Sequence, residues 1–160
     1  MGIIVNPDYD VLVQKKGRGY FWENSSSRIG DGNLGLSGGL YFGLFGGRIK
    51  QGEKSSEDAF KREVGEEWGE KYGMQIENVR HFLSQPFEEE IPAKKRRGTI
   101  DYFAAKFDGN LSKITLNEGA GMVLFSEQEF LGPLRYMIFP PNLEAILKFY
   151  RDIKQGAFQI

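Results

Sequence analysis

The chain has 160 residues, of which 40% are hydrophobic and 27% are charged, and its net charge is −1. These values predict one folded domain over residues 1–160 and exclude a disordered chain, because enough apolar side chains are present to form a core. The near-zero charge gives no general attraction to nucleic acid or anionic membranes, so neither is expected as a partner. No apolar run approaches the ~20 residues that span a bilayer.

The chain contains no cysteine and a single histidine, His81. Disulfides, thiolate zinc sites and cysteine nucleophiles are thereby excluded, and a histidine-based triad or metal site is not expected. The N-terminal residues lack the basic and apolar segments of a signal peptide, and we expect a cytoplasmic protein. Any metal binding or acid–base catalysis must therefore rely on carboxylates.

The first part of the chain is predicted to be a β-hairpin followed by a long loop. Residues 2–16 alternate in the manner of two strands, with turn residues between Pro7 and Asp10. Residues 17–39 are rich in Gly, Ser and Asn, and a loop of that length is usually functional. Its aromatic residues, which include Tyr20 and Phe21, either cover an edge of the core or stack on a substrate ring.

Further elements follow from periodicity and cap residues. Strands are expected over residues 40–45, 76–87, 99–107 and 122–125. Helical segments are expected from Ser55 or Ser56 to Tyr72, over residues 126–129 and over residues 142–153. The acidic run 88–90 and the basic run 94–97 flank Pro92 and predict an exposed loop. The basic run fits a solvated surface, a contact with substrate phosphate, or a contact with RNA or a protein partner.

The helix that begins near Ser55 is predicted to separate apolar from acidic side chains. Its apolar stripe consists of Phe60, Val64, Trp68 and Tyr72, and the neighbouring arc carries Glu63, Glu66, Glu67 and Glu70. Like charges three or four residues apart cost about 1–2 kcal/mol in total. A divalent cation would reverse that cost, and Mg²⁺ prefers such oxygen ligands. The glutamates alone fit either a solvated helix face or a metal site.

Glycines before this helix favour the metal site. The segment Gly47-Arg-Ile-Lys-Gln-Gly-Glu53, followed by Arg62-Glu63-Val-Gly-Glu66-Glu67-Trp-Gly, resembles the box of the Nudix hydrolase family. That box reads G-x5-E-x7-R-E-U-x-E-E-x-G-U, where U is a bulky apolar residue, and the match covers residues 47–70. Three positions depart from it: eight residues separate Glu53 from Arg62, Glu70 stands at the last apolar position, and Phe45 stands where the family often has proline.

The resemblance implies an α/β fold, an α/β/α sandwich with a mixed central β-sheet. It also implies that Mg²⁺ or Mn²⁺ is bound by Glu63, Glu66 and Glu67, with a main-chain carbonyl from Gly46 or Gly47. Arg62 is expected to orient a glutamate by an ion pair, and Glu53 to lie near it. The general base is then Glu63, Glu66 or a residue of a distant loop.

The implied activity is metal-dependent hydrolysis of a nucleoside diphosphate linked to another group, an acid anhydride of phosphorus. We favour (deoxy)nucleoside triphosphates or oxidised nucleotides as substrates. The alternatives are a nucleotide-sugar or ADP-ribose pyrophosphatase and a non-catalytic nucleotide-binding sensor. Substrate contacts are expected from Arg48, Tyr20, Phe21 and Glu118. The expected partner is a small nucleotide; the apolar C-terminal helix also fits a homodimer, although a role in the core explains it equally well.

Overall fold

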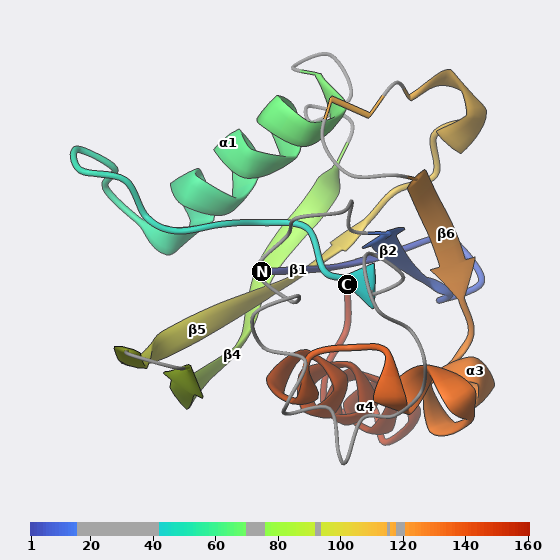
Figure 1. Ribbon diagram of the computed structural model, residues 1–160. Helices are drawn as coiled ribbons and strands as arrows, with labels where there is room; N and C mark the ends of the chain where they lie inside the picture. The colour runs from blue at the N-terminus through green and yellow to red at the C-terminus, as the bar shows by residue number, and fades with distance from the viewer. Residues whose placement is uncertain (16–41, 70–75, 92–93, 115, 118–120) are drawn as a thin grey trace.

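The computed structural model describes residues 1–15, 42–69, 76–91, 94–114, 116–117 and 121–160 (Figure 1). Within these residues, six strands form one mixed sheet: β1 (Gly2–Val5), β2 (Val11–Lys15), β3 (Phe42–Gly43), β4 (Glu77–Ile91), β5 (Lys94–Lys106) and β6 (Gly121–Phe125). The strand order is β3-β2-β1-β5-β4, and β6 also pairs with β2. β1 and β5 are parallel, whereas the other pairs are antiparallel. The helices are α1 (Ser56–Trp68), α3 (Glu127–Leu131) and α4 (Pro140–Lys154), with 3₁₀ turns η3 (Leu111–Lys113) and η4 (Pro133–Tyr136).

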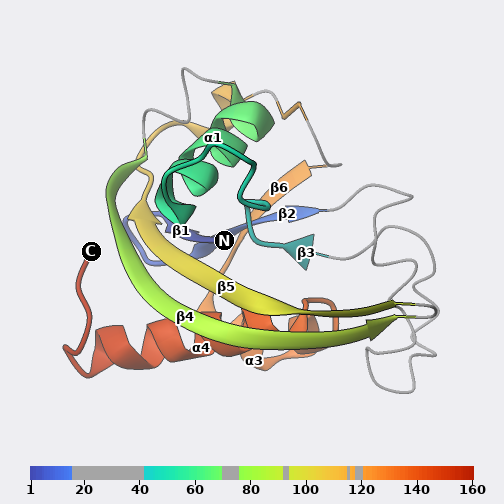
Figure 2. The same cartoon turned by 90° about the vertical axis from the view of Figure 1, so that its left-hand side faces the viewer.

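Alternating side chains direct the two faces of the sheet toward separate helical layers. In β1, Ile3 and Val5 belong to a core cluster shared with α4, whereas Ile4 belongs to a second cluster shared with α1. This is the result of the two-residue period of a strand that is covered on both faces. Figure 2 shows α1 on one side of the sheet and α3 and α4 on the other. The predicted α/β architecture, with a mixed central sheet between helices, is confirmed.

The hairpin formed by β4 and β5 is longer than predicted. Figure 2 shows it as a curved two-stranded ribbon that reaches beyond the helices. The prediction of an exposed loop over residues 88–97 is wrong, because most of that segment continues the two strands. The register places residues 88–90 opposite residues 95–97, so that an acidic run faces a basic run. Opposite charges on facing positions of an antiparallel pair favour the pairing, whereas either run taken alone is typical of a loop.

Helix α1 is held on the sheet by its apolar stripe. Phe60 stacks on Phe103 of β5 with an interplanar angle of 7°, and the Trp68 ring lies edge-on to Phe45 and Phe107. The helix begins as predicted, since the Ser55 side chain accepts a hydrogen bond from the main-chain N–H of Asp58. It is shorter than predicted at its C-terminal end, and Glu70 and Tyr72 lie outside the described residues. The helix ends at Trp68 because the next residue, Gly69, has φ 84°, a conformation that favours glycine and stops a helix.

The remaining elements lie close to their predicted positions. The hairpin over residues 2–16 is confirmed, with β1 and β2 antiparallel. The strand expected over residues 40–45 is limited to Phe42–Gly43 in the described part of the chain. Helix α4 begins two residues earlier than predicted, at Pro140, because proline suits the first helical turn. No helix in the described ranges is long and apolar enough to cross a membrane.

Candidate active site

The segment between β3 and α1 brings main chain against a carboxyl group of the helix. Gly47 lies two positions after Phe45, which is anchored to β1 because its carbonyl accepts a hydrogen bond from the Gly2 N–H at 2.8 Å. The Glu63 carboxyl group lies where a Cβ on Gly47 would be, so any side chain at position 47 would overlap it. Glycine at position 47 thus lets the Glu63 carboxyl group take up this position, and the reason is close approach rather than backbone conformation.

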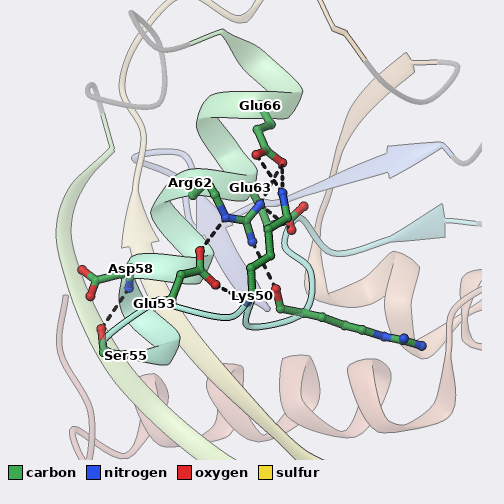
Figure 3. A network of polar contacts seen from close by, with 8 residues as sticks. Lys50, Glu53, Ser55, Asp58, Arg62, Glu63 and Glu66 are labelled. Carbon is green, nitrogen blue, oxygen red and sulfur yellow. Dashed lines mark hydrogen bonds and ion pairs between the residues drawn. The ribbon is translucent and has the colours of Figure 1, made fainter.

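Arg62 is the centre of a network of carboxylates (Figure 3). Its Nε donates to Glu53 Oε1 at 2.5 Å, and one terminal nitrogen lies 2.7 Å from Glu63 Oε1 and 2.8 Å from Glu66 Oε2. The other terminal nitrogen donates to the main-chain carbonyl of Arg48 at 3.1 Å. The guanidinium group thus connects the loop to three glutamates of the predicted site, as the resemblance implied for Arg62 and Glu53.

Lys50 adds a second cation that the sequence analysis did not single out. Its Nζ lies 3.0 Å and 3.2 Å from the two carboxyl oxygens of Glu66. The loop that carries it is held by Glu53, which accepts from the Lys50 main-chain N–H and donates its own N–H to the Lys50 carbonyl. Lys50 lies within the variable x5 stretch of the box, so the box pattern gives no signal for its role.

These cations keep two of the carboxylates ionised. The hydrogen bond from Arg62, followed by that from the Lys50 N–H, lowers the pKa of Glu53. The hydrogen bond from Lys50 lowers the pKa of Glu66, with the charge of Arg62 acting in the same direction. The hydrogen bonds and charges of its glutamate partners, chiefly Glu53, raise the pKa of Arg62. These two carboxylates are therefore negatively charged at neutral pH, which suits them to bind cations.

Glu67 differs from the other glutamates in its surroundings. Its side chain is buried, with 4% of its surface exposed, whereas Glu66 is exposed and turned toward Lys50 and Arg62. Among the described residues, no three acidic or histidine side chains converge on one point. Binding of a metal ion by all three predicted glutamates would therefore require Glu66 to exchange its ion pairs for the metal.

The single histidine does not form a hydrolytic triad. His81 Nε2 lies 3.0 Å from Ser84 Oγ, and Ser84 Oγ donates to Asp101 Oδ1 at 2.6 Å. In a triad the imidazole lies between the serine and the carboxylate, whereas here the serine lies between the other two. The hydroxyl groups of Ser84 and then Ser56 lower the pKa of Asp101. This cluster joins β4, β5 and the start of α1, and we assign it a structural role.

Four residues were predicted to contact substrate. Arg48 is exposed beside the network, and its main-chain carbonyl binds Arg62. Tyr20, Phe21 and Glu118 lie outside the described residues. Their predicted contacts with substrate stay predictions.

The whole fold is similar to that of several solved structures. They include an Ap4A hydrolase from C. elegans in a binary complex (TM-score 0.59, 12% identity, 96% of each chain covered). They also include the ORF135 protein of E. coli (TM-score 0.54, 20% identity, 93% of this chain and 86% of that chain). A third is the MutT protein of Methanosarcina mazei Go1 (TM-score 0.56, 20% identity, 96% of this chain and 91% of that chain). This chain has a Nudix-type fold. No family model matches the sequence, and comparison with curated proteins gives no match.

The residues of the Nudix-type box fit the metal that the resemblance implies. Glu63, Glu66 and Glu67 supply the oxygen donors that Mg²⁺ and Mn²⁺ prefer. Because Gly47 has no side chain, the Glu63 carboxyl group lies directly against the main chain of Gly47. The donor chemistry and this close approach agree with a hard divalent cation at the Gly47 end of the network.

Proposed function

We propose that this chain hydrolyses a phosphoanhydride bond in a nucleoside diphosphate derivative, with Mg²⁺ or Mn²⁺ held by Glu63, Glu66 and Glu67. The observation that carries the proposal is the contact of the Glu63 carboxyl group with Gly47, beside the Arg62 network, on a Nudix-type fold. A helix face that served only solubility would not need a glycine opposite it to make room for one of its carboxylates. The solved structures with this fold include proteins described as Ap4A hydrolase and MutT, which agrees with a hydrolase that acts on nucleotides.

The side chains of the network divide the chemistry between them. A bound Mg²⁺ or Mn²⁺ would shield the anionic diphosphate and lower the pKa of a water molecule. Arg62 fixes the orientation of Glu63 and Glu66 and connects them to the loop. Lys50 is exposed and would contact a phosphate oxygen of the substrate once its ion pair with Glu66 is broken.

We assign Glu63 as the general base. Glu66 is bound by both Lys50 and Arg62, and the lowered pKa that results makes it a poor proton acceptor. Glu63 has Arg62 as its described ion-pair partner, and its carboxyl group lies beside the main chain of Gly47. The proton of the attacking water would pass to a Glu63 carboxyl oxygen as the water oxygen bonds to phosphorus and the P–O bond of the leaving group breaks.

The substrate class is tested by a panel of nucleotides in the presence of Mg²⁺. The panel contains nucleoside and deoxynucleoside triphosphates, 8-oxo-dGTP, ADP-ribose, nucleotide sugars and dinucleoside polyphosphates. We expect hydrolysis of nucleoside triphosphates or their oxidised forms, with a nucleoside monophosphate among the products. Tight binding of one compound, without hydrolysis of any compound in the panel, would show that the chain is a nucleotide-binding sensor rather than an enzyme.

A charge-removing variant tests the site itself. Glu67→Gln keeps the size of the side chain and removes its charge, and we expect activity to fall at least ~100-fold, since a catalytic metal contributes several kcal/mol. The matched control is Glu57→Gln on the same helix, because Glu57 pairs with Lys61 at positions that the box leaves variable. Wild-type turnover in Glu67→Gln, with substrate depletion measured under saturating Mg²⁺, would remove the assignment.

A further inference from the structure

The last turn of α1 carries Glu66 and Glu67 and ends without a basic residue of its own. The final carbonyl groups of a helix have no partner within the helix and need donors from elsewhere. Lysine or arginine often supplies such donors, but no basic residue is present in the last turn of α1. The conformation of Gly69 ends the helix directly after Trp68, so the main chain of the two glutamates lies at the end of the helix.

Asn117 supplies two of these donors from a distant part of the chain. Its main-chain N–H donates to the carbonyl of Glu67 at 2.8 Å. Its side-chain Nδ2 donates to the carbonyl of Glu66, also at 2.8 Å, across 51 positions of sequence. One residue therefore binds the main chain of two consecutive glutamates, both of which belong to the proposed ligand set. Asn117 is exposed, so it contributes hydrogen bonds rather than apolar burial.

The other parts of α1 are fixed by different contacts. The N-terminus is capped by Ser55, and the middle packs through Phe60 and Val64. At the C-terminal end, Trp68 fixes the apolar side of the helix, but the rotation of the last turn also depends on its carbonyl groups. A turn that frays would move the Glu66 and Glu67 side chains together, because each follows its own Cα.

We propose that Asn117 is a positioning residue that fixes the last turn of α1, and through it the carboxylates of Glu66 and Glu67, for metal binding. This inference rests on the proposed function, since it assumes that these glutamates bind the metal. Asn117 does not touch the metal or the substrate in this role. It acts on the main chain of the residues that do.

The test compares Asn117→Ala with a second asparagine that caps a turn elsewhere. Asn110 accepts a hydrogen bond from the Ser112 N–H at 2.9 Å and caps η3, so Asn110→Ala removes an exposed cap whose hydrogen bonds stay within its own turn and do not reach α1. Binding of Mn²⁺ to each substrate-free protein is measured by electron paramagnetic resonance. Urea unfolding of the same samples shows whether each variant is folded and how much stability it has lost.

We expect Asn117→Ala to weaken Mn²⁺ binding about 10-fold, the lower end of the ~10–100-fold loss seen when groups that orient metal ligands are removed. Asn110→Ala should bind Mn²⁺ like the wild type. Asn117→Gln keeps an amide donor on a side chain one methylene longer, and its affinity should lie between those of Asn117→Ala and the wild type. Asn117→Gln also keeps the test valid if Asn117→Ala does not fold.

The outcomes separate this inference from the proposed function. Wild-type Mn²⁺ affinity in a folded Asn117→Ala variant, or in Asn117→Gln if Asn117→Ala does not fold, overturns the role of Asn117 and leaves the metal site intact, provided that the wild-type chain binds Mn²⁺. An equal loss of affinity in Asn110→Ala also overturns it, because the effect would then follow from stability. A wild-type chain that binds no Mn²⁺ overturns both proposals together.

Discussion

Replacing Gly47 by alanine should separate the stability of this protein from its activity. The added Cβ would lie 2.7 Å from Glu63 Oε2 and closer still to the rest of that carboxyl group, whereas ordinary contact begins at 3.4 Å. The Oε2 atom must therefore move by at least 0.7 Å, the difference between these two distances. The atoms that must move are the end of a flexible side chain, so the main chain can stay in place.

The expected cost to folding is small. Moving the Glu63 carboxyl group weakens its ion pair with Arg62, which is partly exposed, and such pairs contribute about 0–1 kcal/mol. The change from glycine to alanine also lowers the entropy of the unfolded chain and returns about 0.4–1 kcal/mol. The two effects nearly cancel, and the free energy of unfolding should change by less than ~1 kcal/mol. For a chain of this size that is a shift of at most about 2–4 °C in Tm.

The expected cost to activity is large. Displacement of a catalytic group by about 1 Å reduces rates by ~100-fold, and Glu63 is both a proposed ligand and the assigned base. The assay measures kcat/KM for the best nucleotide of the panel at saturating Mg²⁺, together with Tm by circular dichroism. Gly98→Ala is the control, since its Cβ would meet the ring of Phe87 on the β4–β5 hairpin, outside the Arg62 network. If Gly47→Ala kept full activity with an unchanged Tm, the close approach of Glu63 would have no catalytic meaning.

Three further predictions address the charges and the core. Arg62→Met should lower activity and also reduce stability at neutral pH. Arg62 helps to lower the pKa of its carboxylate partners below the usual 4.5, so these ion pairs stabilise the fold above that pH and lose their effect as the pH falls through the lowered pKa. Urea unfolding curves of the variant and the wild type should therefore converge in acid. Lys50→Met removes a cation that competes with a metal ion for Glu66. Mn²⁺ should then bind up to ~5-fold more tightly, because the exposed ion pair between Lys50 and Glu66 contributes about 0–1 kcal/mol. Weaker Mn²⁺ binding in a titration would contradict this competition. Tyr102→Phe leaves the buried Asn142 Oδ1 without its 3.0 Å donor and should lower the free energy of unfolding in urea by about 1–3 kcal/mol. Adding Asn142→Leu should recover part of that loss. Strictly additive effects of the two substitutions would refute an energetic coupling between these residues.

Local patterns in the sequence determined much of this protein. The turn after β1, the cap at Ser55 and the apolar stripe of α1 all depend on residues within a few positions of each other. The spacing of the box placed Arg62 among Glu53, Glu63 and Glu66, and the structure shows these contacts. Short-range signals of this kind can be read from one sequence because the physical partners are neighbours in the chain.

Tertiary structure decided the features whose partners are far apart in the chain. The acidic run 88–90 and the basic run 95–97 belong to two strands whose register sets one run opposite the other. The contact of Lys50 with Glu66 and the pairing of Asn117 with the end of α1 join segments separated by 16 and 51 positions. No local period records such pairs, since they exist only after the sheet brings the loops to one end of the helix. The sequence therefore predicted the carboxylates of the proposed site, and the fold decided which cation and which amide contact them.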